Sequence, residues 1–323
     1  MTEMPVYLDG DGLLALLTPA EALSAIQAFF ASHGPEQVVV PSRIHLPVPG
    51  RNTTGLYMPA ATETFIGVKI VHLMPERFPS VEAEVFLYDA ESGRLLFWGD
   101  GKPMTALRTA AVSAAASLRL MPQCKTLMVY GAGVQAAAHV SAFLSAYPGL
   151  EEVWAVTRSE ESWRRLRGSL EAALPGNLPL DRVRRADQPK AVLGAADCIV
   201  TTTPAAEPLF AWEDLAPEAH VVGVGSATHD MNELPPEAFL EGRVWLDTEG
   251  ALEEAGDCRA ALARGWSTER LEGNLFDLLG NAGGNLPREA GRRTVFKSVG
   301  HAAQDLAVLM RLWERIRPGN PTG

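Results

Sequence analysis

The chain has 323 residues, of which 47% are hydrophobic and 21% charged, and its formal net charge is −11. This length suffices for two domains or one large domain with a substantial core. The acidic balance argues against nucleic acid or an anionic membrane as a partner. No apolar run approaches a bilayer span, and the first residues lack a signal-peptide layout, so we expect a cytoplasmic protein. The three widely spaced cysteines show no metal-ligand spacing, and we predict no metal site.

The N-terminal third predicts a helix followed by short strands. Residues 18–21 (Thr-Pro-Ala-Glu) supply the capping residue, first-turn proline and glutamate of a helix start, and this helix should end near Ser32. Residues 89–93 favour a hairpin turn. The pattern after the helix indicates an antiparallel sheet rather than βαβ units. The expected strands are Val38–Leu46, Thr53–Met58, Phe65–Leu73, Glu82–Tyr88 and Arg94–Trp98.

A helix expected at Thr105–Leu120 leads into alternating strands and helices. This alternation is what a parallel sheet with helices on both faces requires. The strands expected are Lys125–Tyr130, Glu152–Thr157, Cys198–Thr203, His220–Gly225 and Arg243–Asp247, and the helices are Gln135–Ser145, Glu160–Leu174 and Ser298–Ile316. We therefore predict an α/β protein with a Rossmann-type doubly wound parallel sheet in residues 117–298. Residues 1–116 and 299–323 should form an α+β substrate domain with an antiparallel sheet.

Residues 126–136 combine a short apolar strand, a G-x-G-x-x-A pattern and the start of a helix. In this context Gly131 permits the tight turn, Gly133 lets the backbone approach a pyrophosphate, and Ala136 lets the helix pack closely. The helix N-terminus would direct free N–H groups at the phosphates. The alternative is a plain glycine-rich turn of another α/β fold. The residues we assign to the dinucleotide here are Gly131, Ala132, Gly133, Val134 and Gln135.

The strand after the glycine loop ends in Thr157, Arg158 and Ser159. NAD-binding Rossmann folds carry a carboxylate at this strand end, which accepts hydrogen bonds from the ribose hydroxyls. Here two hydroxyls and a guanidinium replace it, and these groups suit a 2′-phosphate. We therefore predict NADP(H) as the preferred cofactor, with NAD(H) possible. The alternative interpretation is that Arg158 is a solvated surface arginine.

Three cations interrupt apolar stretches of the first domain: Arg43 and Lys69 in expected strands, and Arg108 near the start of a helix. Buried cations are costly unless they are paired or held for a ligand. One such residue could be a structural ion pair. Three of them in an acidic protein are better explained by a bound carboxylate, which indicates a small organic acid as the substrate.

Together with the glycine loop, these segments resemble the ornithine cyclodeaminase/mu-crystallin family over residues 40–307. The segments that carry the resemblance are Arg43, Met58-Pro59-Ala60, Gly67-Val68-Lys69, residues 107–111 (Leu-Arg-Thr-Ala-Ala), 131–136, Asp247-Thr248, 254–257 (Glu-Ala-Gly-Asp) and 294–300 (Thr-Val-Phe-Lys-Ser-Val-Gly). The resemblance implies a homodimer built through the N-terminal domain and the C-terminal helix. It also implies that Arg43, Lys69 and Arg108 hold the substrate carboxylate. Thr109 and Ser298 would lie near the cofactor, and we add Thr203 to that set.

Two departures from the family pattern bear on the reaction. Ornithine cyclodeaminases carry a glutamate just before the Met-Pro pair, where this chain has Leu56-Tyr57, and an aspartate where this chain has Ala227. Without these acids, ammonia loss lacks its proton-handling groups. A shifted alignment would give that role to Asp230 or Glu233.

We therefore expect a reductase that converts an α-imino acid, such as a cyclic ketimine carboxylate, into the amino acid. Arg43 and Arg108 would clamp the carboxylate. Lys69, its pKa lowered by the two guanidinium groups, would act as the catalytic proton donor. The alternatives are ornithine cyclodeamination, an alanine-type amino-acid dehydrogenase, and a crystallin-like protein that binds NADPH without catalysis.

Overall fold

The computed structural model describes residues 4–77, 80–173, 179–280, 286 and 291–317. The chain divides into two compact units, Met1–Thr109 with His301–Gly323 as unit 1 and Ala110–Gly300 as unit 2. The boundaries predicted from the sequence, after residues 116 and 298, differ from these by a few positions. The roles assigned to the two parts stay predictions.

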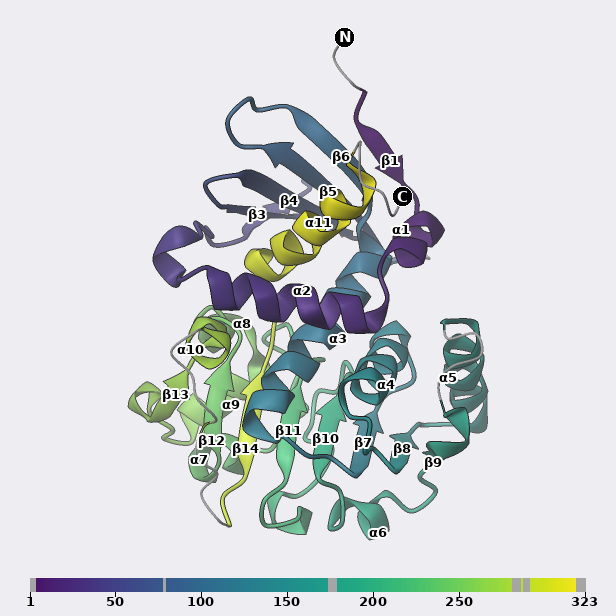
Figure 1. Cartoon of the computed structure of the whole chain (residues 1–323). Helices are drawn as coiled ribbons and strands as arrows, with labels where there is room; N and C mark the ends of the chain where they lie inside the picture. Colours follow the sequence, from purple (N-terminus) through teal and green to yellow (C-terminus); the bar gives the residue numbers. More distant parts are fainter. Residues whose placement is uncertain (1–3, 78–79, 174–178, 281–285, 287–290, 318–323) are drawn as a thin grey trace. The chain divides into compact units, whose positions relative to one another are not determined.

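Unit 1 contains a six-stranded sheet of order β1-β6-β5-β4-β3-β2 (Figure 1). Its strands are β1 (Val6–Leu8), β2 (Ile44–Pro47), β3 (Thr54–Ala61), β4 (Phe65–Leu73), β5 (Val81–Asp89) and β6 (Leu95–Asp100). Strands β2 to β6 pair antiparallel, as predicted. Strand β1, which the sequence analysis missed, pairs parallel with β6, so the sheet is mixed.

The predicted strand Val38–Leu46 is wrong over most of its length. Only Ile44–Pro47 is a strand, and Val39 makes a single bridge to Ala61. Pro41 lies between the two and has no N–H to donate to a ladder, which explains the interruption. Arg43 therefore precedes β2 instead of lying within a strand.

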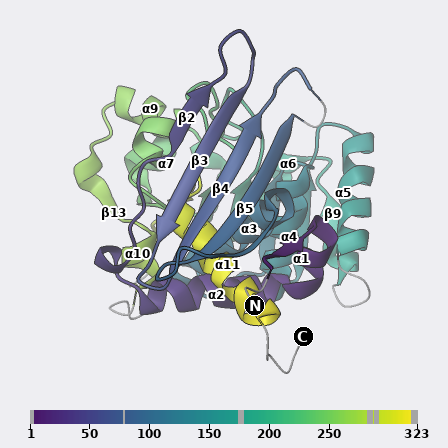
Figure 2. The same ribbon diagram turned by 90° about the horizontal axis from the view of Figure 1, so that it is seen from above.

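Three helices complete unit 1: α1 (Gly10–Leu16), α2 (Pro19–Ser32) and α11 (Ala302–Ile316), with a 3₁₀ turn at Pro35–Gln37. The capping box predicted at Thr18 and Glu21 is present. Helix α11 packs on β3, β4 and α2, beneath the sheet in the view of Figure 2. Gly67 allows this close approach, because a Cβ there would lie 3.0 Å from Leu306. On the other face of the sheet, the part of unit 1 that the structure describes places no helix.

Unit 2 is built on an eight-stranded parallel sheet of order β13-β12-β14-β11-β10-β7-β8-β9. Its strands are β7 (Thr126–Tyr130), β8 (Glu152–Val156), β9 (Val183–Arg185), β10 (Cys198–Thr201), β11 (His220–Gly223), β12 (Arg243–Leu246), β13 (Leu271–Gly273) and β14 (Thr294–Lys297). The five strands predicted for this unit are present with shorter ends. Strands β9, β13 and β14 were not predicted, although β14 lies inside the sheet between β11 and β12.

The long helices of unit 2 are α4 (Val134–Ala146) and α5 (Glu160–Ala173), and α3 (Gly101–Leu120) enters it at Ala110. Helix α3 begins earlier than the predicted Thr105, and Leu174 of the predicted fifth helix lies outside the described residues. The shorter elements are α6 (Pro189–Leu193), α7 (Glu237–Glu241), α8 (Ala251–Glu254), α9 (Gly256–Ala263), α10 (Leu275–Leu279) and 3₁₀ turns at Leu180–Arg182, Trp212–Asp214 and Thr268–Arg270.

Helix α11 begins at Ala302 and not at the predicted Ser298. Gly300 has φ +90°, a left-handed conformation that a right-handed helix cannot contain.

Across the described ranges, no single helix is long and apolar enough to cross a membrane, while the bent pair α1 and α2 passes that test by length and composition alone.

Candidate functional site

The glycine loop follows β7, the strand at which the strand order of the parallel sheet reverses. From β7 the chain passes to β8 and β9 on one side and then returns to β10 on the other side of β7. In open parallel sheets, ligands bind at the carboxyl ends of the strands at such a switch point. The end of β7 at Tyr130 and the turn that follows therefore mark the expected nucleotide site.

Two glycines shape this turn in different ways. Gly131 has φ +125°, and a Cβ there would collide with the side chain of Thr202. Its N–H donates to the carbonyl of Val156 at 3.0 Å, which fixes the turn against β8. Gly133 is the N-cap of α4, and a Cβ built there meets no protein atom within 4 Å. Position 133 therefore has open space beside the backbone, and its role in the approach of a pyrophosphate stays a prediction.

The start of α4 fits a pyrophosphate. Among the described residues no side chain caps this helix, so its first N–H groups can bind a ligand, and the helix dipole favours an anion there. Ala132 and Gln135 are half-buried and Val134 is 71% exposed, a high value for an apolar residue. The side-chain oxygen of Gln135 is buried with no hydrogen-bond partner among the described residues. Ala136 is fully buried, as close helix–sheet packing requires.

The end of β8 presents the three residues predicted to select the cofactor. Thr157 is half-buried, and Arg158 and Ser159 are exposed. The Ser159 hydroxyl accepts the N–H of Ser162 at 3.1 Å and so caps the first turn of α5. Within the described ranges Arg158 has no ion pair, whereas the carboxylate of Glu160 is bound by Arg185 at 2.8 Å. An arginine with no acidic partner is available for an anionic ligand.

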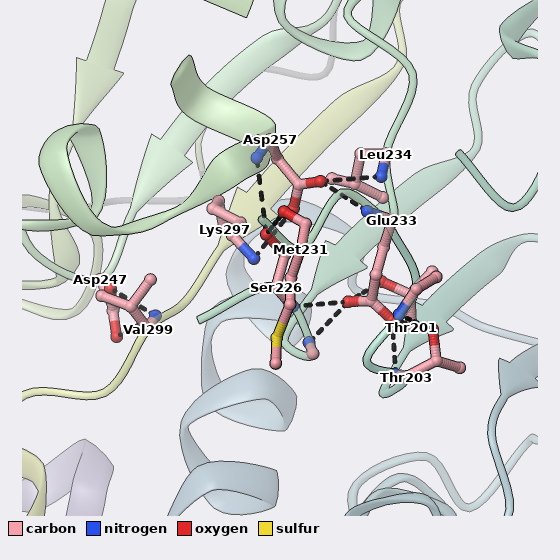
Figure 3. Close-up of polar contacts among 12 residues, drawn as sticks. Thr201, Thr203, Ser226, Met231, Glu233, Leu234, Asp247, Asp257, Lys297 and Val299 are labelled. Atoms are coloured by element: carbon pink, nitrogen blue, oxygen red, sulfur yellow. Dashed lines mark hydrogen bonds and ion pairs between the residues drawn. The ribbon is translucent and has the colours of Figure 1, made fainter. Parts of the chain in front are cut away.

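Thr203 lies just past β10 and is held by a buried carboxylate, that of Glu233 (Figure 3). Both the N–H and the hydroxyl of Thr203 donate to Glu233 Oε1. The other oxygen accepts the Thr201 hydroxyl at 3.0 Å and the N–H groups of Gly225 and Ser226. Burial raises the pKa of Glu233, and the Lys297 charge and the two hydrogen bonds from Thr203 oppose that rise. Glu233 therefore ties the ends of β10 and β11 together, and its carboxylate is already fully used.

Ser298 follows β14 and donates its hydroxyl to Asp247 Oδ2 at 2.7 Å. The same carboxylate accepts the N–H groups of Val299 and Gly300. Thr109, in α3, donates its hydroxyl to the carbonyl of Thr105 at 2.7 Å. Both predicted cofactor residues are buried and have structural hydrogen bonds, and their contact with a cofactor stays a prediction.

In unit 1, Lys69 of β4 and Arg108 of α3 meet at a carboxylate that the sequence analysis did not single out. Lys69 Nζ lies 2.9 Å from Asp305 Oδ2, and Arg108 Nε lies 2.8 Å from Asp305 Oδ1. Arg108 Nη1 also donates to Gln304 Oε1. The Lys69, Arg108 and Asp305 side chains are each at most 4% exposed. One carboxylate between two cations leaves this cluster with a net positive charge.

Burial, the dominant influence, and the neighbouring Arg108 charge lower the pKa of Lys69 to about 8, and the Arg43 charge adds to this. Asp305 opposes the fall through its charge and its hydrogen bond. Two of the predicted carboxylate-binding residues are therefore in direct contact with one shared partner, and the third is near enough to act electrostatically. A lysine with such a pKa exchanges its proton close to neutral pH.

One signal for Asp305 was present in the sequence. It lies beside the apolar stripe of the C-terminal helix, between Ala302 and Leu306, where a charged residue on a buried face needs a partner.

The described residues contain no group of three or more His, Cys, Asp or Glu side chains that could hold a metal ion.

The parallel sheet with a glycine loop at its switch point gives unit 2 a Rossmann-type fold, in which a dinucleotide site is expected at that loop. The model of the ornithine cyclodeaminase/mu-crystallin family matches residues 14–320, and the chain belongs to this family. The ketimine reductase mu-crystallin of Rattus norvegicus is 32% identical, covering 99% of this chain and all of the relative. A Δ1-pyrroline-2-carboxylate reductase of Bacillus cereus is 31% identical, covering 92% of this chain and 90% of the relative.

A solved structure is similar over almost the whole chain. The Δ1-pyrroline-2-carboxylate reductase of Thermococcus litoralis, in complex with NADH and L-proline, has a TM-score of 0.84 and 25% identity, covering 96% of each chain. The family membership and these matches confirm the predicted family and α/β fold. The chain is an oxidoreductase that uses a nicotinamide cofactor.

Proposed function

We propose that this protein reduces the C=N bond of an α-imino acid to give the amino acid, with a cyclic ketimine carboxylate as the substrate. The observation that carries the proposal is the buried Lys69–Asp305–Arg108 cluster, whose net positive charge suits a substrate carboxylate. The names of the rat and Bacillus relatives, a ketimine reductase and a pyrroline-2-carboxylate reductase, support the same reaction class.

The reaction adds one hydride to the imine carbon and leaves one proton on nitrogen. The reduced nicotinamide supplies the hydride when it is bound. Arg108 and Arg43 orient the carboxylate, and Lys69, with a pKa of about 8, holds a proton for the imine nitrogen. The residues that would hold the cofactor are those of the glycine loop and the first turn of α4, with Thr109, Thr203 and Ser298.

Ammonia elimination from ornithine is less well supported by the side chains present. By the resemblance to ornithine cyclodeaminases, Leu56 and Ala227 occupy the positions of the two acids that this reaction needs. Glu233, one candidate for a shifted alignment, has its carboxylate bound by the ends of β10 and β11. Asp230, the other candidate, is exposed and accepts the Thr228 hydroxyl at 2.6 Å.

NADP(H) is the proposed cofactor in preference to NAD(H). Thr157, Arg158 and Ser159 end the strand without a carboxylate, and Arg158 is exposed. A guanidinium at this position favours a 2′-phosphate over a free hydroxyl.

The reducing cytoplasm is the proposed location, since Cys124, Cys198 and Cys258 are all free and buried.

A homodimer formed through unit 1 is the proposed assembly. The uncovered face of its sheet carries exposed apolar side chains, with Ile44 57%, Leu46 52% and Ile66 36% exposed. Ile44 and Tyr57 are register partners, as are Tyr57 and Ile70, so these apolar positions lie on the same face. An apolar patch of this kind favours association. Sedimentation equilibrium tests it: an Ile44→Glu, Ile66→Glu variant should be monomeric at concentrations where the wild type is dimeric.

The reaction is tested by following NADPH and NADH oxidation with pyrroline-2-carboxylate, piperideine-2-carboxylate, and pyruvate with methylamine as a linear control. We expect the cyclic ketimines to be reduced and Lys69→Ala to abolish turnover while NADPH still binds. Ammonia release from ornithine with catalytic NAD, or a fully active Lys69→Ala variant, would contradict the proposal. Cofactor binding without oxidation of any imino acid would favour the crystallin-like alternative.

A further inference from the structure

We propose that Asp305 is a positioning residue of the reductase site, which holds Lys69 and Arg108 together at one buried carboxylate and favours the ammonium form of Lys69 by its charge. The inference rests on the proposed function for what the cluster serves. Asp305 itself would touch neither the substrate nor the cofactor. It would act through the two cations.

The geometry places one carboxylate between residues from three parts of unit 1. Asp305 projects from α11, and its oxygens lie 3.0 and 2.9 Å from Lys69 Nζ of β4. Oδ1 also lies 2.8 Å from Arg108 Nε of α3. Asp305 is 2% exposed. An anion between the two cations offsets their repulsion, which is weakly screened in a buried place.

Charge balance distinguishes this cluster from an ordinary structural ion pair. A structural pair matches one cation with one anion, whereas here Asp305 serves two. The second acceptor for Arg108 is Gln304 Oε1, which carries no charge. Arg108 is therefore held in place without being neutralised. The arrangement fixes the cations and retains a positive charge for a second carboxylate.

The charged groups around Lys69 set its proton affinity in opposite directions. Burial most of all, then Arg108 from α3 and Arg43 before β2, disfavours the ammonium form. Asp305 from α11 favours it, and Gln304 beside it is neutral. Burial disfavours the ionised form of Asp305, yet the Arg108 and Lys69 charges hold its pKa below the usual range. Asp305 is therefore the one anion among these groups, and it keeps the pKa of Lys69 from falling below about 8.

Three variants test this role through the pH dependence of kcat/KM for ketimine reduction. Asp305→Asn removes the anion, so Lys69 loses its proton at lower pH. The alkaline limb of the kcat/KM profile should therefore move to lower pH by about one pH unit or more. Gln304→Glu adds an anion beside Arg108, so the limb should move up. Glu314→Gln removes an exposed carboxylate from the same helix and should leave the limb unchanged. The imine's own titration is common to all variants and cancels in the comparison.

The opposite shifts expected for Asp305→Asn and Gln304→Glu separate positioning from a structural role, since loss of packing would not move the limb upward. If the alkaline limb lay at the same pH in the wild type and in both variants, the inference would be overturned. The KM for the ketimine should also rise at least about tenfold in Asp305→Asn, with the KM for NADPH unchanged.

A second readout does not depend on activity. NMR of isotopically labelled lysine side chains gives the pKa of each ammonium directly, and the chain's lysines are Lys69, Lys102, Lys125, Lys190 and Lys297. The Lys69 signal, assigned by its loss in Lys69→Ala, should titrate lower in Asp305→Asn than in the wild type. A wild type that reduces no imino acid would refute the proposed function, whereas an unshifted Lys69 titration would refute the role of Asp305.

Discussion

Lys297 Nζ lies 3.0 Å from Asp257 Oδ2, and neither side chain has any exposed surface. The other oxygen of Asp257 accepts the N–H groups of Glu233 and Leu234, at 2.6 and 3.0 Å. Glu233 in turn binds the ends of β10 and β11 (Figure 3). A lysine at the end of β14 is therefore linked through two buried carboxylates to the loops at the carboxyl edge of the sheet, where the nucleotide site is expected.

Replacing Lys297 by Met should destabilise the protein strongly. The change leaves the Asp257 charge buried without its cation, which typically costs about 3–5 kcal/mol. The double variant Lys297→Met, Asp257→Asn removes the charge as well and should recover at least about 1 kcal/mol of that loss. Urea denaturation of the two single variants and the double variant measures the coupling. A Lys297→Met variant as stable as the wild type would contradict this account.

The sequence predicted those features that depend on residues close together in the chain. The capping box of Thr18 and Glu21 and the positive φ of Gly131 follow from residue types at fixed spacing, and both are present in the structure. The sequence also predicted that Lys69 and Arg108 hold a carboxylate, because a cation inside an apolar stretch needs a partner or a ligand. It assigned that carboxylate to the substrate, whereas in the structure both cations contact Asp305.

The partners themselves could not be predicted, because they come from distant parts of the chain. Asp305 lies 236 residues after Lys69, and no periodic pattern encodes that pairing. Strand β14, Thr294–Lys297, has only two apolar residues and ends in a charge, so it lacks the apolar run that marks a buried strand. Its place inside the sheet, and hence the burial of Lys297, depends on tertiary pairing with β11 and β12.

The two glycines of the turn should respond differently to alanine. Gly133 has φ −87° and open space around it, so Gly133→Ala should change stability by less than about 1 kcal/mol. It should nonetheless weaken NADPH binding by at least about tenfold, because the new methyl group stands where the phosphates approach. Gly131→Ala should lose both stability and NADPH binding. Its φ of +125° and the collision of the new Cβ with Thr202 would strain the turn itself. Denaturation and fluorescence titration with NADPH measure the two effects, and unchanged binding in Gly133→Ala would argue against the proposed site.

Acid should destabilise unit 2 through His139. Its Nδ1 lies 2.7 Å from the carbonyl of Gln135 and must donate to it, so Nε2 accepts the Ser113 hydroxyl at 2.9 Å and the ring is neutral. Burial lowers the pKa of His139 from 6.5 to about 4. The neutral ring therefore contributes its full stability above pH 6.5, and this contribution is lost as the pH falls from 6.5 toward 4. The loss amounts to about 3 kcal/mol.

The variant His139→Gln isolates this effect, because the carboxylates titrate alike in both proteins. Its free energy of unfolding should fall less than that of the wild type between pH 6.5 and pH 4. Guanidinium denaturation at a series of pH values gives the two curves. Parallel curves would mean that His139 does not carry the acid sensitivity.

Cofactor preference should depend on Arg158. A charged hydrogen bond to a phosphate contributes about 1.5–3 kcal/mol, so Arg158→Ala should raise the KM for NADPH at least about tenfold. The KM for NADH should stay unchanged, because that cofactor has no 2′-phosphate for the guanidinium to bind. Arg164→Ala is the matched control, since Arg164 is an exposed arginine of α5 that lies 3.4 Å from Glu160. If both variants raised the two KM values equally, the effect would be one of general charge, and the strand end after β8 would not select the cofactor.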